Sequence, residues 1–281
     1  PTVNFTPTFC NAQLTVNQGG NLNLKPEESR QQNLGIVFQP MRDVSVSVDY
    51  WKIKVKKQIQ IPDADERLAD FLNTLVADTS IDYDPTTAKL TPAAKAALNG
   101  GQAGTGIVRD PVSGNLDYVS IQYDNISETT TSGIDIGVNA LLAKTQFGEF
   151  RGSLDATYVN SWKEDGVEEV GNYANNGPVV RWKRKIGVNW SYGEWGAALD
   201  YRWQSGYRDQ GGTRDVSSYE IVDLATSYRP IKGLTVRFGI QNLFDQDPPY
   251  SRQGDYFHVG YDPTYADPRG RTFTFALNYT F

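Results

Sequence analysis

Apolar and small polar residues alternate strictly over the last residues of the chain. Successive side chains of a β-strand point to opposite faces, so this pattern predicts a strand with one apolar and one polar face. The same alternation recurs along most of the chain and predicts nine strands. They are Glu28–Gln39, Val44–Gln60, Thr131–Leu142, Phe150–Ser161, Val179–Ser191, Trp195–Trp203, Ser218–Tyr228, Leu234–Asn242 and Arg271–Phe281.

The ends of these strands carry aromatic residues, which bear on what the apolar face contacts. A soluble sandwich buries its apolar face, whereas a membrane barrel turns it toward lipid and lines its lumen with polar residues. One set of aromatics clusters at short turns: Trp190, Tyr192, Trp195 and Tyr228. A second set lies near the opposite strand ends: Trp162, Trp182, Tyr201, Trp203 and Tyr207. Two aromatic belts at a fixed separation are typical of the two membrane interfaces.

Short and long connections alternate between the predicted strands. The short ones are Pro40–Asp43, Ala143–Glu149, Tyr192–Glu194 and Arg229–Gly233. The long ones are Ile61–Thr130, Trp162–Pro178, Gln204–Ser217 and Leu243–Gly270. Short turns on one side and long loops on the other are typical of an outer-membrane barrel. A soluble sandwich is not expected to show this alternation of short and long connections. We therefore expect an all-β antiparallel transmembrane barrel whose long loops are extracellular.

The longest connection, residues 61–130, is expected to hold secondary structure of its own, because structureless loops of this length are uncommon. Apolar residues at helical spacing predict a helix over Asp63–Ala77, and a second short helix is predicted over Thr91–Leu98. Two runs, Gly106–Asp110 and Asn115–Tyr123, predict a small hairpin.

Arg184 is an exception on the apolar face of its predicted strand. An arginine at the bilayer midplane of a barrel costs about 2–4 kcal/mol, but little near the interface. We therefore predict that Arg184 lies toward the long-loop end of its strand.

Composition and charge exclude several classes of protein. The net charge is −6 and the isoelectric point about 4.9, which argues against a nucleic-acid binder. The mean hydropathy is −0.50, and no apolar run approaches the roughly 18 residues of a membrane-spanning helix. Cys10 and His258 are the only residues of their types, so the chain has no internal disulfide and no zinc cluster. We recognise no nucleophile–base pair, phosphate loop or carboxylate dyad, and expect no enzyme, no metal and no cofactor.

Aromatic side chains mark the last long loop, Leu243–Gly270, as a candidate binding site. They are Tyr250, Tyr256, Phe257, His258, Tyr261 and Tyr265. Aromatics on a long loop suit capture of a ligand by stacking, and the alternative is packing within the loop itself.

Five motifs, in this order along the chain, resemble a known family. They are GNLNLKPE at 20–27, SVSVDYW at 45–51, TSGID at 131–135, QNLFD at 241–245 and YDPTYADPRGR at 261–271. They resemble the C-terminal half of the β-barrel of a TonB-dependent receptor of the Gram-negative outer membrane. This resemblance implies a barrel of about 22 strands with a plugged lumen, of which these nine would be the last.

The resemblance also implies partners. The plug domain and TonB box lie N-terminal to such a barrel, and we expect this chain, residues 1–281, to be its C-terminal portion, cut from a longer precursor. Its open edges would be completed by the N-terminal barrel half, since lipid does not tolerate bare strand edges. The TonB complex would act through the plug, and outer-membrane lipid would surround the wall.

Two sets of residues acquire roles from the resemblance. Charged residues of the polar face would line the lumen and contact the plug, or simply be solvated: Asp135, Asp155, Asp200, Arg202, Asp223 and Arg237. The final strand would be the signal that the barrel assembly machinery binds, through Phe273, Phe275, Leu277, Tyr279 and Phe281.

The function that the resemblance implies is TonB-dependent uptake of a scarce, large solute. A ferric siderophore is the default of the family, followed by oligosaccharide, peptide and cobalamin. Two alternatives remain open at the level of the sequence: a passive porin-like channel, and a secreted glycan-binding β-sandwich or adhesin.

Overall fold

The computed structural model describes residues 15–64, 67, 83–84, 89–90, 106–109, 116–174 and 177–280. The chain divides into two compact units. The smaller unit comprises Pro1–Glu28 and Lys56–Ser127, and the larger comprises Ser29–Val55 and Glu128–Phe281.

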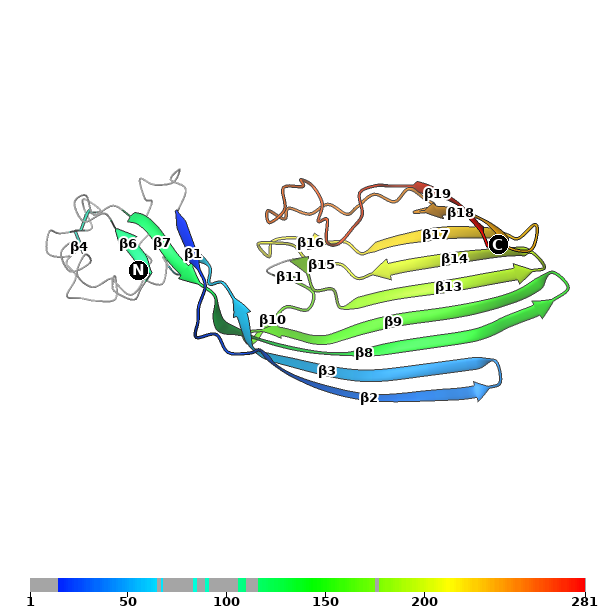
Figure 1. The fold of residues 1–281 in the computed structure, drawn as a ribbon, viewed down its shortest axis with the longest axis horizontal. Coiled ribbons are helices and arrows are strands. Elements are labelled where there is room, and N and C mark those ends of the chain that lie inside the picture. The colour runs from blue at the N-terminus through cyan, green and yellow to red at the C-terminus, as the bar shows by residue number, and fades with distance from the viewer. Residues whose placement is uncertain are drawn as a thin grey trace. The chain divides into compact units, whose positions relative to one another are not determined.

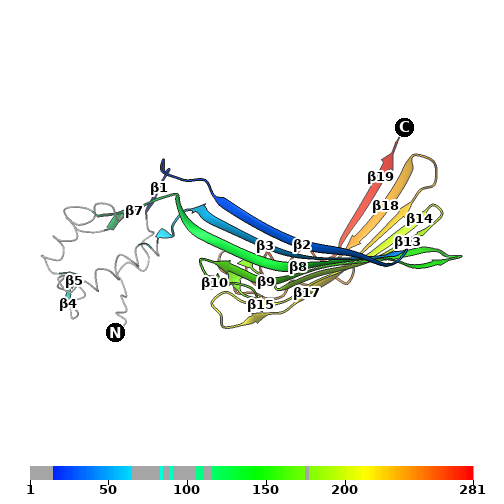
Figure 2. The same cartoon turned by 90° about the horizontal axis from the view of Figure 1, so that it is seen from below.

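One large antiparallel sheet dominates the larger unit (Figure 1). Within the described residues, its principal strands are β2 (Glu28–Met41), β3 (Val44–Gln60), β8 (Asp124–Thr145), β9 (Gly148–Glu164), β13 (Trp182–Tyr192), β14 (Trp195–Gln204), β17 (Tyr219–Tyr228), β18 (Leu234–Gln241) and β19 (Thr272–Tyr279). Their order in the sheet is their order in the sequence, and the short strand β10 (Val167–Glu168) pairs with β9. The sheet is open, with β2 and β19 at its edges, and the strands twist as one layer when seen from below (Figure 2).

The nine predicted strands are thereby confirmed, in the predicted order. The main correction concerns β8, which begins at Asp124 rather than at Thr131 and so shortens the preceding connection. Its first residues, DNISETT, lack an alternating apolar pattern, so periodicity alone gives no signal for this part of the strand.

The pairing register gives the sheet two different faces. Leu199 of β14 lies opposite Val188 of β13 and Leu224 of β17, and Asp200 lies opposite Asp223 on the other face. The face that carries Leu199, here called the apolar face, is open: Leu199 is 43 % exposed and Phe275 is 70 % exposed. These apolar side chains therefore do not form an interior of their own, as a soluble sandwich would require.

The opposite face, here called the polar face, includes close packing of glycine against an indole. A Cβ atom at Gly133 of β8 would lie 2.3 Å from the ring of Trp51, and one at Gly137 would lie 2.7 Å from Oγ of Ser47. A glycine at position 133 is therefore required for β3 and β8 to pair while Trp51 lies across the neighbouring strand.

The smaller unit contains the predicted hairpin. The strand β6 (Ile107–Arg109) pairs antiparallel with β7 (Leu116–Gln122), and β1 (Val16–Gly19) pairs parallel with the other side of β7. Ile107, Val119 and Ile121 form its buried cluster. A further short pair joins β4 (Tyr83–Asp84) to β5 (Lys89–Leu90).

The predicted helices fall mostly outside the described residues. Of Asp63–Ala77, Ala64 and Arg67 are described as helical, and the amide of Arg67 donates a 3.0 Å hydrogen bond to the carbonyl of Asp63. The remainder of this helix and all of Thr91–Leu98 lie outside the described residues. No helix that the structure describes is long and apolar enough to cross a bilayer.

The other long connections contain short β-ribbons that the sequence pattern did not predict. They are β11 (Tyr173–Ala174) with β12 (Gly177–Pro178), and β15 (Tyr207–Arg208) with β16 (Asp215–Val216). Both ribbons lie beyond the same ends of the principal strands, together with the connection between β18 and β19 (Figure 1). This end of the sheet, here called the loop end, holds the candidate site.

Candidate functional site

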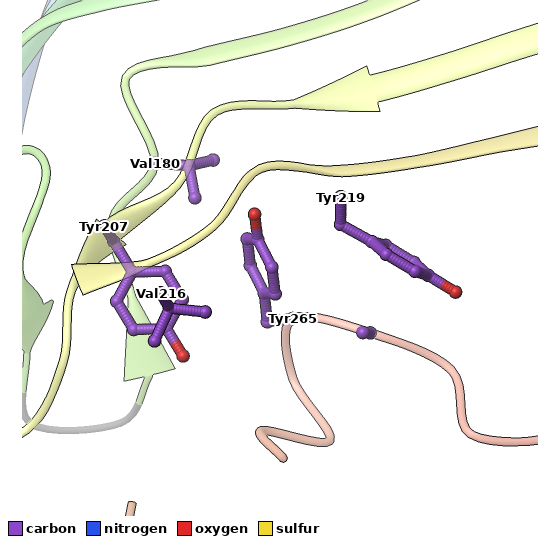
Figure 3. Close-up of a cluster of buried hydrophobic side chains, with 6 residues drawn as sticks. Val180, Tyr207, Val216, Tyr219 and Tyr265 are labelled. Carbon is purple, nitrogen blue, oxygen red and sulfur yellow. The ribbon is translucent and has the colours of Figure 1, made fainter. Parts of the chain in front are cut away.

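A buried aromatic cluster holds the long connections together at the loop end (Figure 3). Its members are Val180, Tyr207, Val216, Tyr219, Tyr265 and Ala266, and Tyr173 packs against them. The rings of Tyr207 and Tyr265 meet edge to face with their centroids 5.0 Å apart. The hydroxyl of Tyr265 donates to the carbonyls of Ser205 and Ser217, at 3.1 and 3.0 Å. Tyr265 therefore fastens the loop between β18 and β19 to the two ends of the connection between β14 and β17.

Burial raises the pKa of the Tyr265 and Tyr207 phenols well above the ordinary tyrosine value. For Tyr173, burial and the nearby carboxylate of Asp255 raise the pKa of the phenol in the same direction. The three phenols therefore stay neutral over the physiological range, and their hydroxyls remain available as hydrogen-bond donors.

Two buried carboxylates continue this cluster as hydrogen-bond acceptors. Asp209 is 2 % exposed and accepts from the hydroxyl of Ser251 at 2.7 Å, the amide of Arg252 at 2.8 Å and the amide of Gln210 at 3.0 Å. Asp262 accepts from the amide and the hydroxyl of Thr264, both at 2.7 Å. Hydrogen bonds to a charged carboxylate are stronger than those between neutral groups. The carboxylates of Asp209 and Asp262 therefore hold the loops that contain their donors in defined positions.

A cavity of about 710 Å³ opens between the polar face and the loop 263–270. Its walls come from β9, β13, β14, β17 and β18, with Asp155, Thr157, Lys183, Arg202 and Gln241 among the lining residues. This volume falls in the range of pockets that hold drug-sized ligands.

Ion pairs organise the polar face around the cavity. Lys185 Nζ lies 3.1 Å from Asp200 Oδ2, and Arg202 Nη2 lies 2.7 Å from Asp223 Oδ2. At the rim, Arg269 Nη2 lies 2.6 Å from Asp267 Oδ2, and this contact lowers the pKa of the Asp267 carboxyl. The walls thus present both charges together with neutral hydrogen-bonding groups, which suits a polar ligand rather than a hydrocarbon.

Aromatic rings line the two ends of the apolar face. At the turn end, the rings of Trp195 and Tyr228 stack with centroids 4.2 Å apart. At the loop end, the guanidinium of Arg184 lies 3.9 Å from the ring centroid of Trp203. Arg184 is close to the first residue of β13 and opposite Ala156 and Trp203, so its predicted position on the apolar face near the loop end is confirmed.

Comparison with known families decides the identity of this sheet. A family model described as "TonB dependent receptor-like, beta-barrel" matches residues 2–243, which is most of the chain. The chain belongs to the TonB-dependent receptor family. No curated protein matches the chain.

Solved structures of TonB-dependent receptors share the fold. A mutant ferric enterobactin receptor, PfeA of Pseudomonas aeruginosa, in complex with enterobactin, is 19 % identical with a TM-score of 0.61, over 94 % of this chain and 33 % of that one. The copper transporter OprC is 14 % identical with a TM-score of 0.54, over 92 % and 33 %. The FrpB iron transporter of Neisseria meningitidis is 10 % identical with a TM-score of 0.55, over 94 % and 33 %. The chain thus spans about a third of the length of these structures.

TonB-dependent receptors are outer-membrane proteins of Gram-negative bacteria, and this establishes where the sheet lies. The exposed apolar face is the lipid-facing side of a barrel wall, and the polar face is its inner side. The secreted β-sandwich considered from the sequence does not fit this family.

The charged residues predicted on the inner side of the wall share the polar face. Asp135 accepts a 2.7 Å hydrogen bond from the hydroxyl of Thr157, and Asp155 lines the cavity. Asp200, Arg202 and Asp223 belong to the ion pairs described above. Arg237 lies opposite Ser227 on the same face. Contact of these residues with a plug domain stays a prediction.

The aromatic residues predicted to capture a ligand fall into two groups. Phe257 is 90 % exposed, and its ring centroid lies 4.3 Å from that of His258. The ring centroids of His258 and Tyr261 are 5.6 Å apart. Tyr250 is exposed, with the guanidinium of Arg214 4.5 Å from its ring centroid.

Tyr256 and Tyr265 form the second group, because hydrogen bonds hold them within the loop end. Tyr256 is half-buried, and its amide donates a 2.8 Å hydrogen bond to Oε1 of Gln253. Tyr265 is 7 % exposed, so for this residue the structure favours the packing alternative over ligand stacking.

The apolar residues predicted as the assembly signal lie on the edge strand. Phe273, Phe275, Leu277 and Tyr279 are exposed on the apolar face of β19, and Phe281 lies outside the described residues. Binding by the assembly machinery stays a prediction.

Proposed function

We propose that this chain forms the C-terminal part of the wall of a transporter that takes up a scarce, large solute across the outer membrane in a TonB-dependent manner. The observation that carries the proposal is the loop end, where the aromatic cluster and the two buried aspartates fix the long loops around a polar cavity. Loops held in defined positions around a polar cavity support a protein that binds its solute specifically.

A ferric siderophore is the solute that we propose first. The ferric enterobactin receptor PfeA and the FrpB iron transporter share this fold, and the polar cavity has room for part of such a chelate. The exposed rings of Tyr250 and Phe257 would offer stacking surfaces for an aromatic ligand at the entrance. Oligosaccharide, peptide and cobalamin are the other solute classes to be compared in growth assays.

The energy for release would reach the ligand through a plug domain. In this proposal the N-terminal barrel half closes the wall between the β2 and β19 edges, and the plug occupies the polar side of the sheet. TonB, energised by the inner membrane, pulls on the plug and frees the ligand. The assembly machinery would insert the barrel by binding β19.

Uptake of radioactive iron by whole cells tests this function. The complete receptor that contains this chain is expressed in a Gram-negative strain without its own siderophore receptors, with and without TonB. We expect binding of the ferric siderophore in both strains and accumulation only in the strain that has TonB. Equal accumulation in the two strains would contradict the proposal and support a passive channel.

A further inference from the structure

A buried glutamine lies within a small closed segment of the connection between β18 and β19. The segment 251–260, here called the tip loop, is closed where the amide of Ser251 donates a 3.2 Å hydrogen bond to the carbonyl of Gly260. Gln253 lies within this segment and is only 7 % exposed. Its backbone amide donates a 3.1 Å hydrogen bond to Oγ of Ser251, so Gln253 is joined to the closed end of the tip loop.

The side-chain amide of Gln253 holds the tip loop together from within. Its Nε2 donates hydrogen bonds to the carbonyls of Tyr256, His258 and Tyr261, at 3.4, 2.8 and 3.2 Å. Its Oε1 accepts the amide of Tyr256 at 2.8 Å. An apolar side chain would offer these groups neither donor nor acceptor, and a carboxylate would offer acceptors alone. A glutamine supplies both kinds of group at the same place.

A second glutamine joins the tip loop to the neighbouring connection between β14 and β17. Oε1 of Gln210 accepts the amide of Gly254 at 2.6 Å, and its Nε2 donates to Oδ1 of Asp255 at 2.8 Å. The tip loop is therefore held from within by Gln253 and from outside by its neighbour.

The outer part of the tip loop presents two large apolar side chains. Phe257 is 90 % exposed and Val259 is 91 % exposed. They flank His258, whose carbonyl is bound by Gln253. A backbone fixed at His258 restricts the directions in which its two neighbours can point. A surface that is already fixed loses little conformational freedom when a ligand binds, and this strengthens binding.

We propose that Gln253 is a positioning residue for the transported solute: it holds the backbone at His258 so that the ring of Phe257 stands ready to stack on an aromatic group of an iron chelate. This role rests on the proposed function, in which the exposed ring of Phe257 is a stacking surface. It extends that function to a buried residue that acts through Phe257 and does not itself contact the solute.

Binding of ferric enterobactin, whose iron ligands are aromatic catechols, to the purified complete receptor tests this role by calorimetry. The variants are Gln253→Met, Phe257→Ala and the combination of the two. Methionine keeps the length of the side chain, adds no charge and removes the hydrogen bonds. The control is Gln246→Met, an exposed glutamine of the same connection whose side chain donates to the adjacent carbonyl of Asp247 at 3.3 Å.

We expect Phe257→Ala to weaken binding by about two- to tenfold, the range for the loss of one stacked ring. Gln253→Met should weaken binding by a similar factor. The double variant should bind no more weakly than either single variant, because both substitutions remove the same contact. The control should bind as the native receptor does.

Spin labels on the tip loop and on the wall measure the positioning without any ligand. The labels are attached to Val259→Cys and to Ile186→Cys on β13, both exposed, with Cys10→Ser as background. We expect the distribution of distances between the two labels to be narrow in the native receptor and in the Gln246→Met control, and broad in Gln253→Met. Heat-modifiable migration in gel electrophoresis verifies that each variant barrel is folded.

Three results would overturn the role of Gln253. The first is unchanged affinity of Gln253→Met, or a double variant whose loss is the product of the two single losses, because Gln253 would then not act through Phe257. The second is a distance distribution that stays narrow in Gln253→Met, whatever the binding result. The third is a native receptor that does not bind the chelate, which shows that the proposed solute itself is wrong and removes the role that rests on it.

Discussion

The hydroxyl of Ser251 donates a 2.7 Å hydrogen bond to Oδ1 of Asp209, and both side chains are buried. Asp209 lies between β14 and β17, whereas Ser251 lies between β18 and β19. A bond between two loops that are far apart in the sequence makes them move as one body. The shape of the cavity beneath them therefore depends on this contact.

Asp209→Ala should loosen these loops without unfolding the wall. The substitution leaves the hydroxyl of Ser251 and the amides of Arg252 and Gln210 without their acceptor, and each buried unsatisfied group costs about 1–3 kcal/mol. Limited proteolysis of the complete receptor in detergent should show faster cleavage within residues 204–217 and 243–270. The control is Asp215→Ala in the same loop, whose carboxylate is exposed and pairs with Arg208. Such surface pairs contribute about 0–1 kcal/mol, so equal cleavage of the two variants would contradict the prediction.

High pH should open the same loops. Burial raises the pKa of the Tyr207 and Tyr265 phenols above their unfolded value of about 10. The neutral phenols therefore contribute stability that is complete below about pH 10 and is lost as the pH rises beyond it. Tyrosinate absorbance should show a late-ionising class of phenols that Tyr265→Phe reduces, and in denaturant all phenols should ionise together. If the late phase of the titration of the folded receptor is the same in the Tyr265→Phe variant, the prediction that burial raises the pKa of Tyr265 is wrong.

An arginine in the middle of the apolar face should destabilise the wall. Leu199 lies midway between Trp195 and Trp203 of β14 and its side chain is open to lipid. Leu199→Arg should therefore lower the free energy of unfolding in liposomes by about 2–4 kcal/mol. Tyr192→Arg, at the turn end of the same face, should cost about 0–1 kcal/mol. Equal losses in the two variants would mean that depth in the bilayer does not govern these positions.

Strand order and strand faces could be predicted from the sequence because alternation is a local property. Leu199 and Asp200 are neighbours of opposite character, so the period alone places them on opposite faces, and the register confirms it. Arg184 could be placed near the interface because the cost of a charge in hydrocarbon leaves no other position on that face.

The loop end could not be predicted in the same way. Irregular loops have no period, so nothing in the sequence shows that Asp209 and Ser251 meet, or that Tyr265 is enclosed rather than presented to a ligand. A tyrosine suits both roles equally well. Only the contacts that neighbouring loops make decide between them.

Spin labels on the two faces of the wall measure directly which face meets hydrocarbon. With Cys10→Ser as background, labels are attached to Leu199→Cys and Phe275→Cys on the apolar face, and to their neighbours Ala198→Cys and Thr274→Cys on the polar face, in the receptor reconstituted in liposomes. We predict that labels at 199 and 275 collide with oxygen dissolved in lipid and not with a water-soluble nickel chelate, and that labels at 198 and 274 show a lower ratio of oxygen to nickel collisions. Labels at 199 and 275 that are shielded from both reagents, or that meet the nickel chelate, would contradict a lipid-facing wall.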